Sequence, residues 1–509
     1  MASVRTMPDV VAAHRATRGR ELAAADGDVS LTWDELGERA DVVAAALRSE
    51  GIGPGDRVLW LGQNSIRLWE LMVGVSKVGG SLCPTNWRQR PEELAFVIDD
   101  LDPALTVWQR EEVGEEVRAG REAASRTGGR WICHDDGEWD AWLASAAPAP
   151  ATSEAEPDQA LLLFYTAAFS GRPNAAMLSH RALLTQGEVM AEYTEAAPTD
   201  RYLCGGPLFH VGTFMFALAT FVAGGANVFV RRNDGEAVCL AIDRWACTGG
   251  YVVGPMGADA AAANGDGRWD LSTFRGRVGH PAFDAMVRPD RSPWGRHPGG
   301  YGQTEVVGMA TFNLLAPDGI GEHGKPSPLV ELRVVGPDDE ELATGETGEI
   351  CVRGTTVMNG YWNRPEENER RSRGGRHHTN DVGRFEEDGS FTFVGPKTRM
   401  LKSGAENIYP AEVEACLRAH PSVAHAAVIG VPDARWVQSV KAVVVPAPGA
   451  AVDEAELIEH CRTRIASYKK PRSVEVVEAI PRQGLAVDYD ALDQRFGGGN
   501  YPGTGTRSV

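Results

Sequence analysis

The sequence lacks several features that would place it in common classes of protein. Its eight cysteines are scattered along 509 residues and form no C-x-x-C pair, which disfavours a disulfide framework or a structural zinc site. Basic residues are in the minority, because 51 Lys and Arg face 70 Asp and Glu, a formal net charge of −19. Nucleic acid and anionic membranes would be repelled by such a chain at long range, so neither is an expected partner.

Long uninterrupted apolar runs are also missing. The N-terminal MASVRTMPDVV has an Arg and an Asp where a signal peptide needs an apolar core. The most apolar stretch, residues 213–230, is interrupted by Gly224, Gly225 and Asn227. It therefore predicts a buried helix, a glycine turn and a strand instead of a membrane span. These absences indicate a cytoplasmic protein with reduced cysteines and no membrane insertion.

The pattern of the first hundred residues indicates an α/β fold. Residues 31–48 predict a helix that begins after Thr32, with Glu35 three residues on as the partner in a capping box. Residues 57–61 predict a strand and residues 65–77 a second amphipathic helix. Strands that alternate with helices of this length indicate doubly wound sheets.

The length of the chain requires at least two domains. Beyond residue 395 the helix and strand signals alternate over about a hundred residues and predict a small α+β unit. We therefore expect a large N-terminal domain over residues 1–394 and a small, mobile C-terminal domain over residues 395–509.

The stretch FYTAAFSGRPNAAMLSH, residues 164–180, is central to the functional interpretation. An apolar strand runs into a turn of small residues, and a helix is predicted from Ser179. Backbone N–H groups and the helix dipole at such a junction can receive a phosphate. The segment resembles the phosphate loop of adenylate-forming enzymes, the superfamily of acyl-CoA synthetases, luciferases and peptide-synthetase adenylation domains. That loop usually reads Tyr-Thr-Ser-Gly-Thr-Thr-Gly-x-Pro-Lys-Gly, and the register holds here without a gap.

The resemblance implies that this loop binds the phosphates of ATP. Apart from Ser170, which replaces a threonine conservatively, the family's usual residues are replaced at five positions, namely Ala167, Ala168, Phe169, Asn174 and Ala175. The residues expected to contact the nucleotide are Thr166, Ser170, Gly171 and Asn174. The loop thus has the length and alignment of the family's motif, while many of the residues expected to bind phosphate are changed.

A second motif, GYGQTE at residues 300–305, matches the family's Tyr-Gly-x-Thr-Glu turn in full. Tyr301, between Gly300 and Gly302, offers a ring face for adenine. By the resemblance, Thr304 contacts the α-phosphate and Glu305 supplies a hard oxygen to Mg²⁺, which keeps most of its water.

Three other segments extend the resemblance over nearly the whole chain. His210 ends a Pro-Leu-Phe-His turn that lines the acid pocket in the family. Val278-Gly279-His280-Pro281 stands where the family has a Gly-Gly-Ala-Pro turn, so the imidazole of His280 either caps the adenine or fills space and favours a short or flat acid. Asp381, in TNDVGR, is expected to accept both ribose hydroxyls, a task suited to a carboxylate. The segment KSGAENIYPAEVE, which begins at Lys402, matches the family's hinge region.

Two departures from the family concern positive charge. The arginine that contacts the ribose in the family is Pro396 here, and Lys397 or Arg399 are candidate replacements. The small-domain catalytic lysine of the family would fall at Ala486 or Val487. Lys470 is the last lysine of the sequence, so this group is missing. Arg172, Lys402 or a second metal ion are candidate substitutes, and we include Lys402 with Thr304, Glu305 and His210 among the expected catalytic groups.

The resemblance leaves three functions open. The first is an acyl-CoA ligase that uses ATP and Mg²⁺ to activate a carboxylic acid and then transfers the acyl group to CoA. The second is an ATP-dependent diazotase that activates nitrite toward an aromatic amine and releases AMP and pyrophosphate without CoA. The third is a degenerate relative that binds nucleotide without turnover. In each case the expected partners are small molecules, and a homodimer is one candidate assembly because dimers are common among such enzymes.

Overall fold

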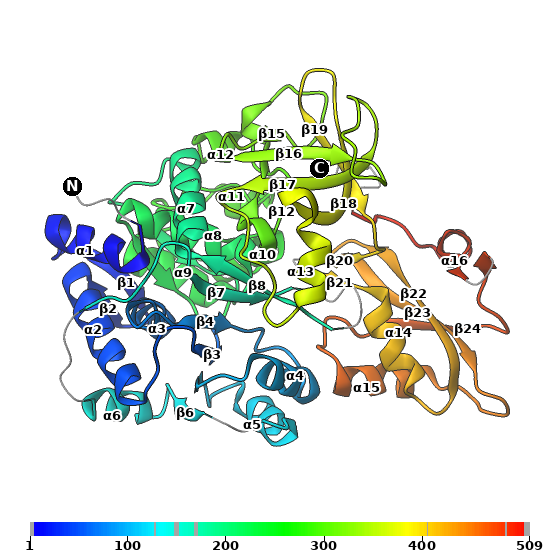
Figure 1. Cartoon of the computed structure of the whole chain (residues 1–509), viewed down its shortest axis with the longest axis horizontal. Coiled ribbons are helices and arrows are strands. Elements are labelled where there is room, and N and C mark those ends of the chain that lie inside the picture. Colours follow the sequence, from blue (N-terminus) through cyan, green and yellow to red (C-terminus); the bar gives the residue numbers. More distant parts are fainter. Residues whose placement is uncertain are drawn as a thin grey trace.

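The computed structural model of the chain describes residues 5–126, 129–146, 152–166, 172–404, 406–483 and 486–502. These residues form a large N-terminal and a small C-terminal domain, which lie side by side in Figure 1. The expected boundary between residues 394 and 395 falls near the end of strand β19 (Phe391–Pro396). The first strand of the small domain, β20 (Leu401–Ser403), follows shortly afterwards.

Two sheets of the large domain confirm the predicted doubly wound α/β architecture. The first has the strand order β6-β5-β3-β4-β7-β8 and is parallel except for the pair β7 and β8. Its strands are β3 (Arg57–Leu61), β4 (Ser81–Pro84), β5 (Leu105–Trp108), β6 (Arg130–Cys133), β7 (Ala160–Tyr165) and β8 (Ala175–Ser179).

The second sheet has the order β11-β9-β10-β1-β2 and is parallel except for the β1–β2 hairpin. Its strands are β1 (Leu22–Asp26), β2 (Val29–Thr32), β9 (Arg201–Cys204), β10 (Ala226–Phe229) and β11 (Gly249–Gly250). The two-residue strand β11 forms one edge of this sheet.

The helices of the large domain begin where the sequence predicts them in the segments analysed above. Thr32 caps α2 by accepting a hydrogen bond from the Glu35 N–H at 3.2 Å, and the Glu35 carboxylate accepts from the Thr32 N–H at 2.7 Å. The helices are α1 (Met7–Arg18), α2 (Trp33–Ser49), α3 (Ile66–Lys77), α4 (Pro91–Leu101), α5 (Gly114–Ala123), α6 (Glu138–Ala144), α7 (His180–Thr194), α8 (Val211–Ala223), α9 (Gly235–Trp245), α10 (Gly254–Ala263), α11 (Pro281–Asp284), α12 (Pro293–Arg296) and α13 (Pro365–Arg371).

Helices α3 and α8 connect the two sheets through a buried aromatic core. The Trp69 ring of α3 lies 5.5 Å from Phe214 of α8 and 5.5 Å from Phe229 of β10. Phe214 in turn lies 5.6 Å from Phe164 of β7 in the first sheet. Since all four rings are almost completely buried, α8 is held firmly, and the turn that precedes it has a defined position at the carboxyl ends of the strands.

An antiparallel sheet and two short hairpins complete the large domain. The sheet has the order β16-β17-β18-β19, with β16 (Val330–Val335), β17 (Gly348–Gly354), β18 (His377–Phe385) and β19. The hairpins are β12 (Gly302–Gln303) with β13 (Gly308–Met309), and β14 (Thr311–Phe312) with β15 (Lys325–Pro326).

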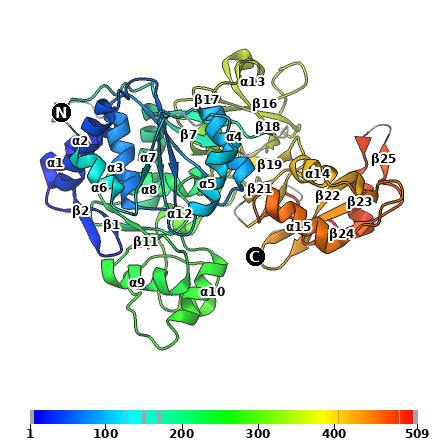
Figure 2. The ribbon, with the colours of Figure 1, turned by 90° about the horizontal axis from the view of Figure 1, so that it is seen from below.

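The small domain is the predicted α+β unit. In its sheet, β23 (Val437–Pro446) pairs with β22 (Val423–Asp433), β24 (Ser473–Val476) and β20, and β20 pairs with β21 (Glu406–Ile408). Its helices are α14 (Pro410–Arg418), α15 (Glu454–Arg464) and α16 (Tyr489–Phe496). A ribbon of β25 (Arg482–Gln483) and β26 (Ala486–Val487) lies at the end of this domain far from the large domain (Figure 2).

The helix predicted from Ser179 is confirmed as α7, but the strand that precedes it was not predicted. The turn after β7 does not open a helix, because β8 follows it and pairs with β7 in an antiparallel hairpin. Helix α7 begins after this strand, and Ser179 caps it by accepting a hydrogen bond from the Ala182 N–H at 3.1 Å. The dipole of α7 therefore acts at the far end of β8, away from the turn, and any phosphate contacts of the turn have to come from its own backbone and side chains.

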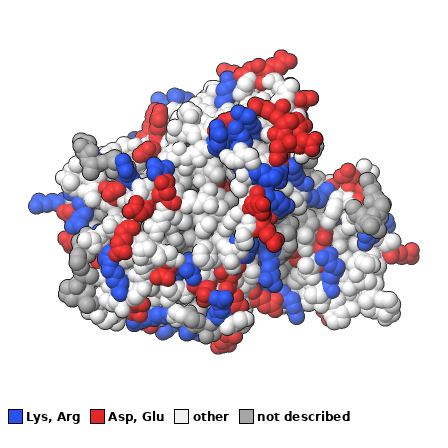
Figure 3. Space-filling model, viewed as in Figure 1, with Lys and Arg blue, Asp and Glu red and all other residues white. Residues whose placement is uncertain are grey.

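Acidic and basic side chains are interspersed over the face seen in Figure 3. Around Glu331, for example, Arg333 and Arg376 each lie 2.8 Å from the carboxylate, and Arg353 lies 2.5 Å from it. Such local pairs offset part of the repulsion that a net charge of −19 creates. Within the described ranges, none of the helices has the length and apolar character that a membrane crossing requires.

Candidate active site

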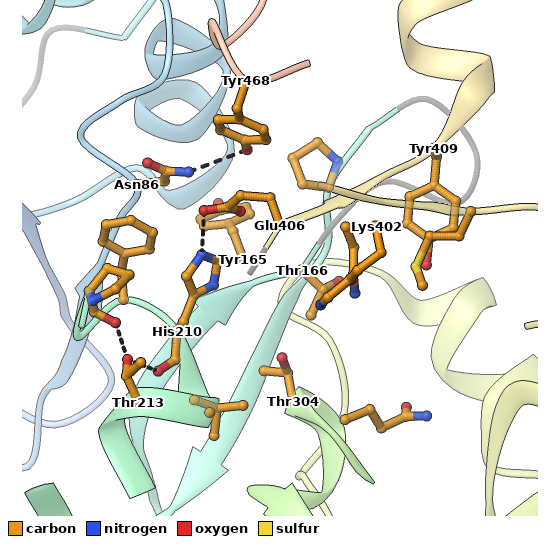
Figure 4. Close-up of a pocket in the computed structure, with 18 of the residues that line it drawn as sticks. Asn86, Tyr165, Thr166, His210, Thr213, Thr304, Lys402, Glu406, Tyr409 and Tyr468 are labelled. Carbon is orange, nitrogen blue, oxygen red and sulfur yellow. Dashed lines mark hydrogen bonds and ion pairs between the residues drawn. The ribbon is translucent and has the colours of Figure 1, made fainter. Parts of the chain in front are cut away.

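A cavity of about 1040 Å³ lies between the two domains. The large domain lines it with the end of β7, the turn before α8, the β12–β13 hairpin and β18, and the small domain with β20, β21 and the ends of α14 and α15. Figure 4 shows side chains from both domains pointing into this space. The predicted site residues that line it are Thr166, His210, Gly300, Tyr301, Gly302, Thr304, Glu305, Asp381 and Lys402.

Two glycines are required for the turn that carries Thr304 and Glu305. Gly300 has φ +147°, and a Cβ atom there would lie 2.1 Å from the Thr311 carbonyl oxygen. A Cβ at Gly302 would lie 1.6 Å from the Gly308 carbonyl oxygen, across the β12–β13 hairpin. No side chain fits at either place, so the backbone can fold tightly and direct Thr304 toward the cavity (Figure 4).

Asp381 lies on β18 and is connected to the same turn. Its carboxylate accepts hydrogen bonds from the Tyr301 hydroxyl at 2.8 Å and from the Gln303 side-chain amide at 3.2 Å. Burial raises the pKa of Asp381 to about 7, although these hydrogen bonds act in the opposite direction. The Tyr301 ring is nearly buried and stacks on Phe393 at 5.2 Å, so one of its faces is already covered.

Glu305 is a buried carboxylate in the 3₁₀ turn Thr304–Val306. Its Oε1 accepts a hydrogen bond from the Tyr361 hydroxyl at 2.7 Å, and burial raises its pKa. The described part of the chain contains no group of three or more His, Cys, Asp or Glu able to hold a metal ion. A single carboxylate suits a magnesium ion that is held mainly by phosphate oxygens and water.

His210 and Glu406 connect the two domains at the cavity wall. Their side chains meet with 3.0 Å between Nε2 and Oε1, and Figure 4 marks this contact. Arg88 also contacts the Glu406 carboxylate. Burial alone would raise the pKa of Glu406, but His210, Arg88 and Lys402 outweigh it and lower the pKa to about 2. Because an ionised carboxylate only accepts hydrogen bonds, Nε2 of His210 carries the proton in this contact.

Further contacts fix the position of the small domain. The Lys469 ammonium bridges Glu93 of α4 and Glu412 of α14, at 2.6 Å from each carboxylate. The Asn86 amide donates to the Tyr468 hydroxyl at 3.4 Å. In this arrangement Lys402 of β20 faces the cavity, donates to the Asn407 amide oxygen at 2.8 Å, and has its pKa lowered by burial.

Two described nucleotide-binding candidates do not line the cavity. The Asn174 amide oxygen accepts a hydrogen bond from Arg364 at 3.0 Å, and Arg364 also pairs with Asp100 at 2.8 Å. His280 caps the short helix α11, and its Nδ1 is buried without a hydrogen-bond partner among the described residues. The predicted contacts of Asn174 and His280 with nucleotide are therefore not supported by this geometry. Ser170 and Gly171 lie outside the described residues.

The proposed replacements for the missing arginine are engaged elsewhere. Lys397 pairs with Glu349 at 2.7 Å, and Arg399 pairs with Asp493 while lying 3.9 Å over the Tyr501 ring. Neither side chain lines the cavity, so this prediction is wrong for the observed arrangement of the domains. The ribbon that contains Val487 also lies away from the cavity, at the outer end of the small domain (Figure 2). Lys402 and Glu406 of the small domain line the cavity, whereas the ribbon around Val487 does not.

Sequence reasoning did not assign roles to several residues that shape this site. Glu406 stands inside the SGAEN motif, which was the available signal for it. Tyr468 carries no comparable signal, and the contacts that Arg88 and Tyr468 make here join residues more than 300 positions apart. Gln303 occupies the variable position of the YGxTE turn and also bonds His377 at 3.0 Å.

The environment of Asn174 leads to a prediction. We expect Asn174→Lys to leave the rate of pyrophosphate release unchanged or to lower it by up to about tenfold, about 1.4 kcal/mol in the barrier. A lysine here would bring a second cation beside Arg364 and disrupt the Asn174–Arg364 hydrogen bond. Asn174→Ala removes the same bond without adding charge and serves as the control. A large gain with lysine would show instead that the loop is a decayed form of the family's usual one.

The cavity between the large and the small domain is large enough for a nucleotide. It is lined on one side by Thr304, Glu305 and Asp381 and on the other by Lys402. This arrangement is typical of a two-domain ligase that activates an acid with a nucleotide. Comparisons with known proteins support this class. The model of the AMP-binding enzyme family matches residues 4–362, and that of the AMP-binding enzyme C-terminal domain matches residues 412–485.

Similar proteins cover nearly the full length of the chain. A feruloyl-CoA synthase from an Amycolatopsis species is 36% identical over 92% of this chain and 95% of its own length. An indoleacetate–CoA ligase from Aromatoleum aromaticum is 30% identical over 89% and 91%. The solved amide bond synthetase McbA from Marinactinospora thermotolerans superposes with a TM-score of 0.79 at 25% identity, over 96% of this chain and 99% of the other. The chain belongs to the AMP-binding enzyme family, as an adenylate-forming ligase of the acyl-CoA ligase type.

Proposed function

We propose that this ligase joins ATP to an aromatic carboxylic acid, releases pyrophosphate, and transfers the acyl group from the acyl-adenylate to the thiol of CoA. The observation that carries this proposal is the convergence of Thr304, Glu305, Asp381, His210 and Lys402 on one cavity. The choice of an aromatic acid and of CoA rests on relatives described as feruloyl-CoA synthase and indoleacetate–CoA ligase.

Each residue has a role that its surroundings support. Asp381 accepts the ribose hydroxyls and replaces its present bonds to Tyr301 and Gln303 in part or in whole. Thr304 donates to the α-phosphate, and Glu305 holds Mg²⁺ together with the phosphates. When bound, Mg²⁺ supplies positive charge that offsets the charge of the phosphates.

Lys402 supplies the positive charge that the segment around Val487 lacks. Its ammonium faces the cavity, and a charge aimed at the developing negative charge in a dry site is worth more than in water. His210 borders the acid, while Glu406 holds its imidazole in one tautomer and orientation. The hinge that brings these small-domain groups into place lies close to the proposed domain division between residues 394 and 395, where β19 ends.

A cation at the cavity, with two more a few residues further along the chain, favours a phosphate-bearing acceptor. Arg464 lines the cavity, and Lys470 and Arg472 follow it in the chain. Arg464 and Lys470 each donate to a backbone carbonyl, of His460 and Ser467 respectively, at 3.3 Å, and Arg472 lies 5.6 Å over the Trp436 ring. Burial lowers the pKa of Lys470, and the nearby Arg472, Arg462 and Arg90 lower it further, so positive charge gathers here in an otherwise acidic protein. The phosphates of CoA fit such a place.

This leads to a second prediction. We expect Arg464→Glu and Arg472→Glu each to raise the KM for CoA by about tenfold, equivalent to about 1.4 kcal/mol. Pyrophosphate release measured without CoA should stay within about twofold of the wild-type rate, because the first half-reaction does not involve the acceptor. Arg20→Glu is the matched control, since Arg20 is exposed on the connection between α1 and β1. An unchanged KM for CoA in both variants would rule out a role for this cation group in binding the acceptor.

One experiment separates the proposed function from the alternatives. Pyrophosphate release is measured with a panel of aryl and fatty acids, with and without CoA, and with nitrite plus an aromatic amine. Release with aryl acids that CoA increases supports the ligase. Release that requires nitrite and an amine identifies a diazotase, which the altered loop at Asn174 and the lack of lysine beyond Lys470 favour as the second candidate. Nucleotide binding without release under any condition identifies a non-catalytic relative.

A further inference from the structure

A second cavity of about 410 Å³ borders the active-site cavity at Tyr251. It lies at the β11 edge of the second sheet of the large domain. We call it the aromatic chamber, because aromatic residues from β9, α8, α12 and the loops around residues 251 and 274 line it. Its aromatic residues are Tyr202, Phe216, Tyr251, Phe274 and Trp294. Volumes of about 300–1,000 Å³ are typical of small-molecule sites, so the chamber is large enough to hold part of a ligand.

The rings of the chamber are arranged to receive a flat group. Tyr202 and Phe216 lie nearly parallel with centroids 6.2 Å apart, and Trp294 meets Phe216 edge to face at 5.3 Å. Part of the polar wall is already paired, because Asp200 pairs with Arg275 at 2.6 Å and accepts from the Thr248 hydroxyl at 2.8 Å. Arg277 and Asp290 line the chamber as well. Because five of the residues that line the chamber are aromatic, it favours an aryl group over an aliphatic one.

Tyr251 borders both the aromatic chamber and the active-site cavity. Its backbone is fixed at the end of β11, where its N–H donates to the Leu203 carbonyl at 3.0 Å. The ring lies against Gly206, and a Cβ at that glycine would come within 2.6 Å of the ring carbon Cδ1. Because Gly206 is in the turn that leads to His210, the Tyr251 ring lies next to the groups expected to border the acid.

The Tyr251 phenol is close enough to the Glu406–Arg88 pair of the active site to be influenced by its charges. Burial raises the pKa of Tyr251, the charge of Glu406 raises it further, and that of Arg88 lowers it. The phenol therefore stands neutral near the Glu406–Arg88 pair, with its ring between the two spaces.

We propose that Tyr251 is a specificity-determining residue that closes the acid site after one aromatic ring and separates it from the aromatic chamber. Removing the Tyr251 ring joins the two spaces and creates a binding site for the distal ring of an extended aryl acid. This inference rests on the proposed function, because it concerns the acid that the ligase activates.

The test compares benzoic acid with biphenyl-4-carboxylic acid by pyrophosphate release. Wild-type enzyme is expected to favour benzoic acid by at least tenfold in kcat/KM. Tyr251→Ala is expected to raise kcat/KM for the biphenyl acid by at least tenfold, and Tyr251→Phe, which keeps the ring, is expected to retain the wild-type preference. An unchanged preference in Tyr251→Ala would overturn the proposal.

A second variant shows whether the gain comes from the aromatic chamber. Gly249 lines the chamber, and a Cβ there would meet the Arg275 carbonyl oxygen at 3.8 Å, an ordinary contact distance. Gly249→Leu in the Tyr251→Ala background is therefore expected to fill the chamber and remove the gain for the biphenyl acid while activity on benzoic acid remains. If the gain persists, the distal ring binds elsewhere and the proposal is wrong.

Titration calorimetry of the same two acids measures binding without turnover. If Tyr251→Ala binds the biphenyl acid more tightly relative to benzoic acid, but no variant releases pyrophosphate, the proposed function is contradicted. The role of Tyr251 in selecting the acid is then still supported. If every variant releases pyrophosphate with benzoic acid, and the preference between the two acids changes neither in binding nor in rate, only the role of Tyr251 is contradicted.

Discussion

Asp381→Ala is expected to abolish pyrophosphate release, with a loss of at least a hundredfold in kcat/KM for ATP. An ionised carboxylate that accepts two ribose hydroxyls makes two charge-assisted hydrogen bonds, each worth about 1.5–3 kcal/mol. Losing both corresponds to about 3–6 kcal/mol, or about two to four orders of magnitude in rate. The same substitution removes the acceptor for Tyr301 and Gln303, so the turn that carries Thr304 also loses its link to β18.

The control for Asp381 is Glu387→Ala, at an exposed carboxylate in the turn between β18 and β19. It changes the net charge by the same amount and should retain the wild-type rate. Circular dichroism of both variants checks that they are folded. If Asp381→Ala also retains the wild-type rate, the carboxylate does not bind the nucleotide and the assignment of the site has to be abandoned.

The raised pKa of Asp381 predicts a pH dependence with a definite sign. Burial raises this pKa to about 7, so the carboxylate is mostly protonated below neutral pH and ionised above it. Since the ribose hydroxyls need an acceptor, kcat/KM for ATP should rise through pH 7 and level off at about pH 8. Asp381→Asn cannot titrate and should flatten this part of the profile. A wild-type profile that falls between pH 6 and pH 8 would contradict the assignment.

Glu305→Gln is the second variant expected to abolish pyrophosphate release. Glutamine keeps an oxygen that can accept the Tyr361 hydrogen bond, so the turn should stay folded, while the negative charge that would hold Mg²⁺ is lost. Removing one charged group of this kind costs about 2.7–4 kcal/mol of barrier, about a hundredfold to a thousandfold in kcat. The rate is measured as a function of the concentration of Mg²⁺.

Two comparisons make the result for Glu305 specific. Glu322→Gln, at an exposed position in the loop before β15, changes the net charge equally and should be silent. Tyr361→Phe removes the hydrogen bond but keeps the charge, so it should cost less than Glu305→Gln and leave the dependence on Mg²⁺ in place. A Glu305→Gln enzyme with a wild-type rate at all concentrations of Mg²⁺ would show that the metal is held by other groups.

Much of the fold was predictable because local signals and burial agree. The Thr32–Glu35 capping box, the strand at Arg57–Leu61 and the break at Gly224 each depend on a few neighbouring residues, and all three occur in the structure. The hairpin of β7 and β8 was missed for the opposite reason. The segment Ala175–Ser179 is short and apolar, and its pairing with β7 is decided by the sheet that both strands join.

The candidate site also has residues that the sequence could identify and contacts that it could not. The turn at Gly300–Glu305 and the residues Asp381 and Lys402 could be assigned from their motifs, because each motif is contiguous. The sequence did not reveal that Asn174 turns toward Arg364, a residue 190 positions away. It also gave no sign that Lys397 and Arg399 are held by Glu349 and Asp493.

By itself the amino-acid sequence determined the α/β architecture, the family and most of the candidate site residues that line the cavity, because these depend on short motifs and on the spacing of apolar residues. Tertiary structure alone decided which groups meet. His210 and Glu406 are 196 positions apart and come within 3.0 Å only when the small domain packs against the large one. Tyr251 stands between two cavities because the backbone at Gly206 leaves room for its ring. Contacts of this kind depend on packing in three dimensions, which no local pattern of residues records.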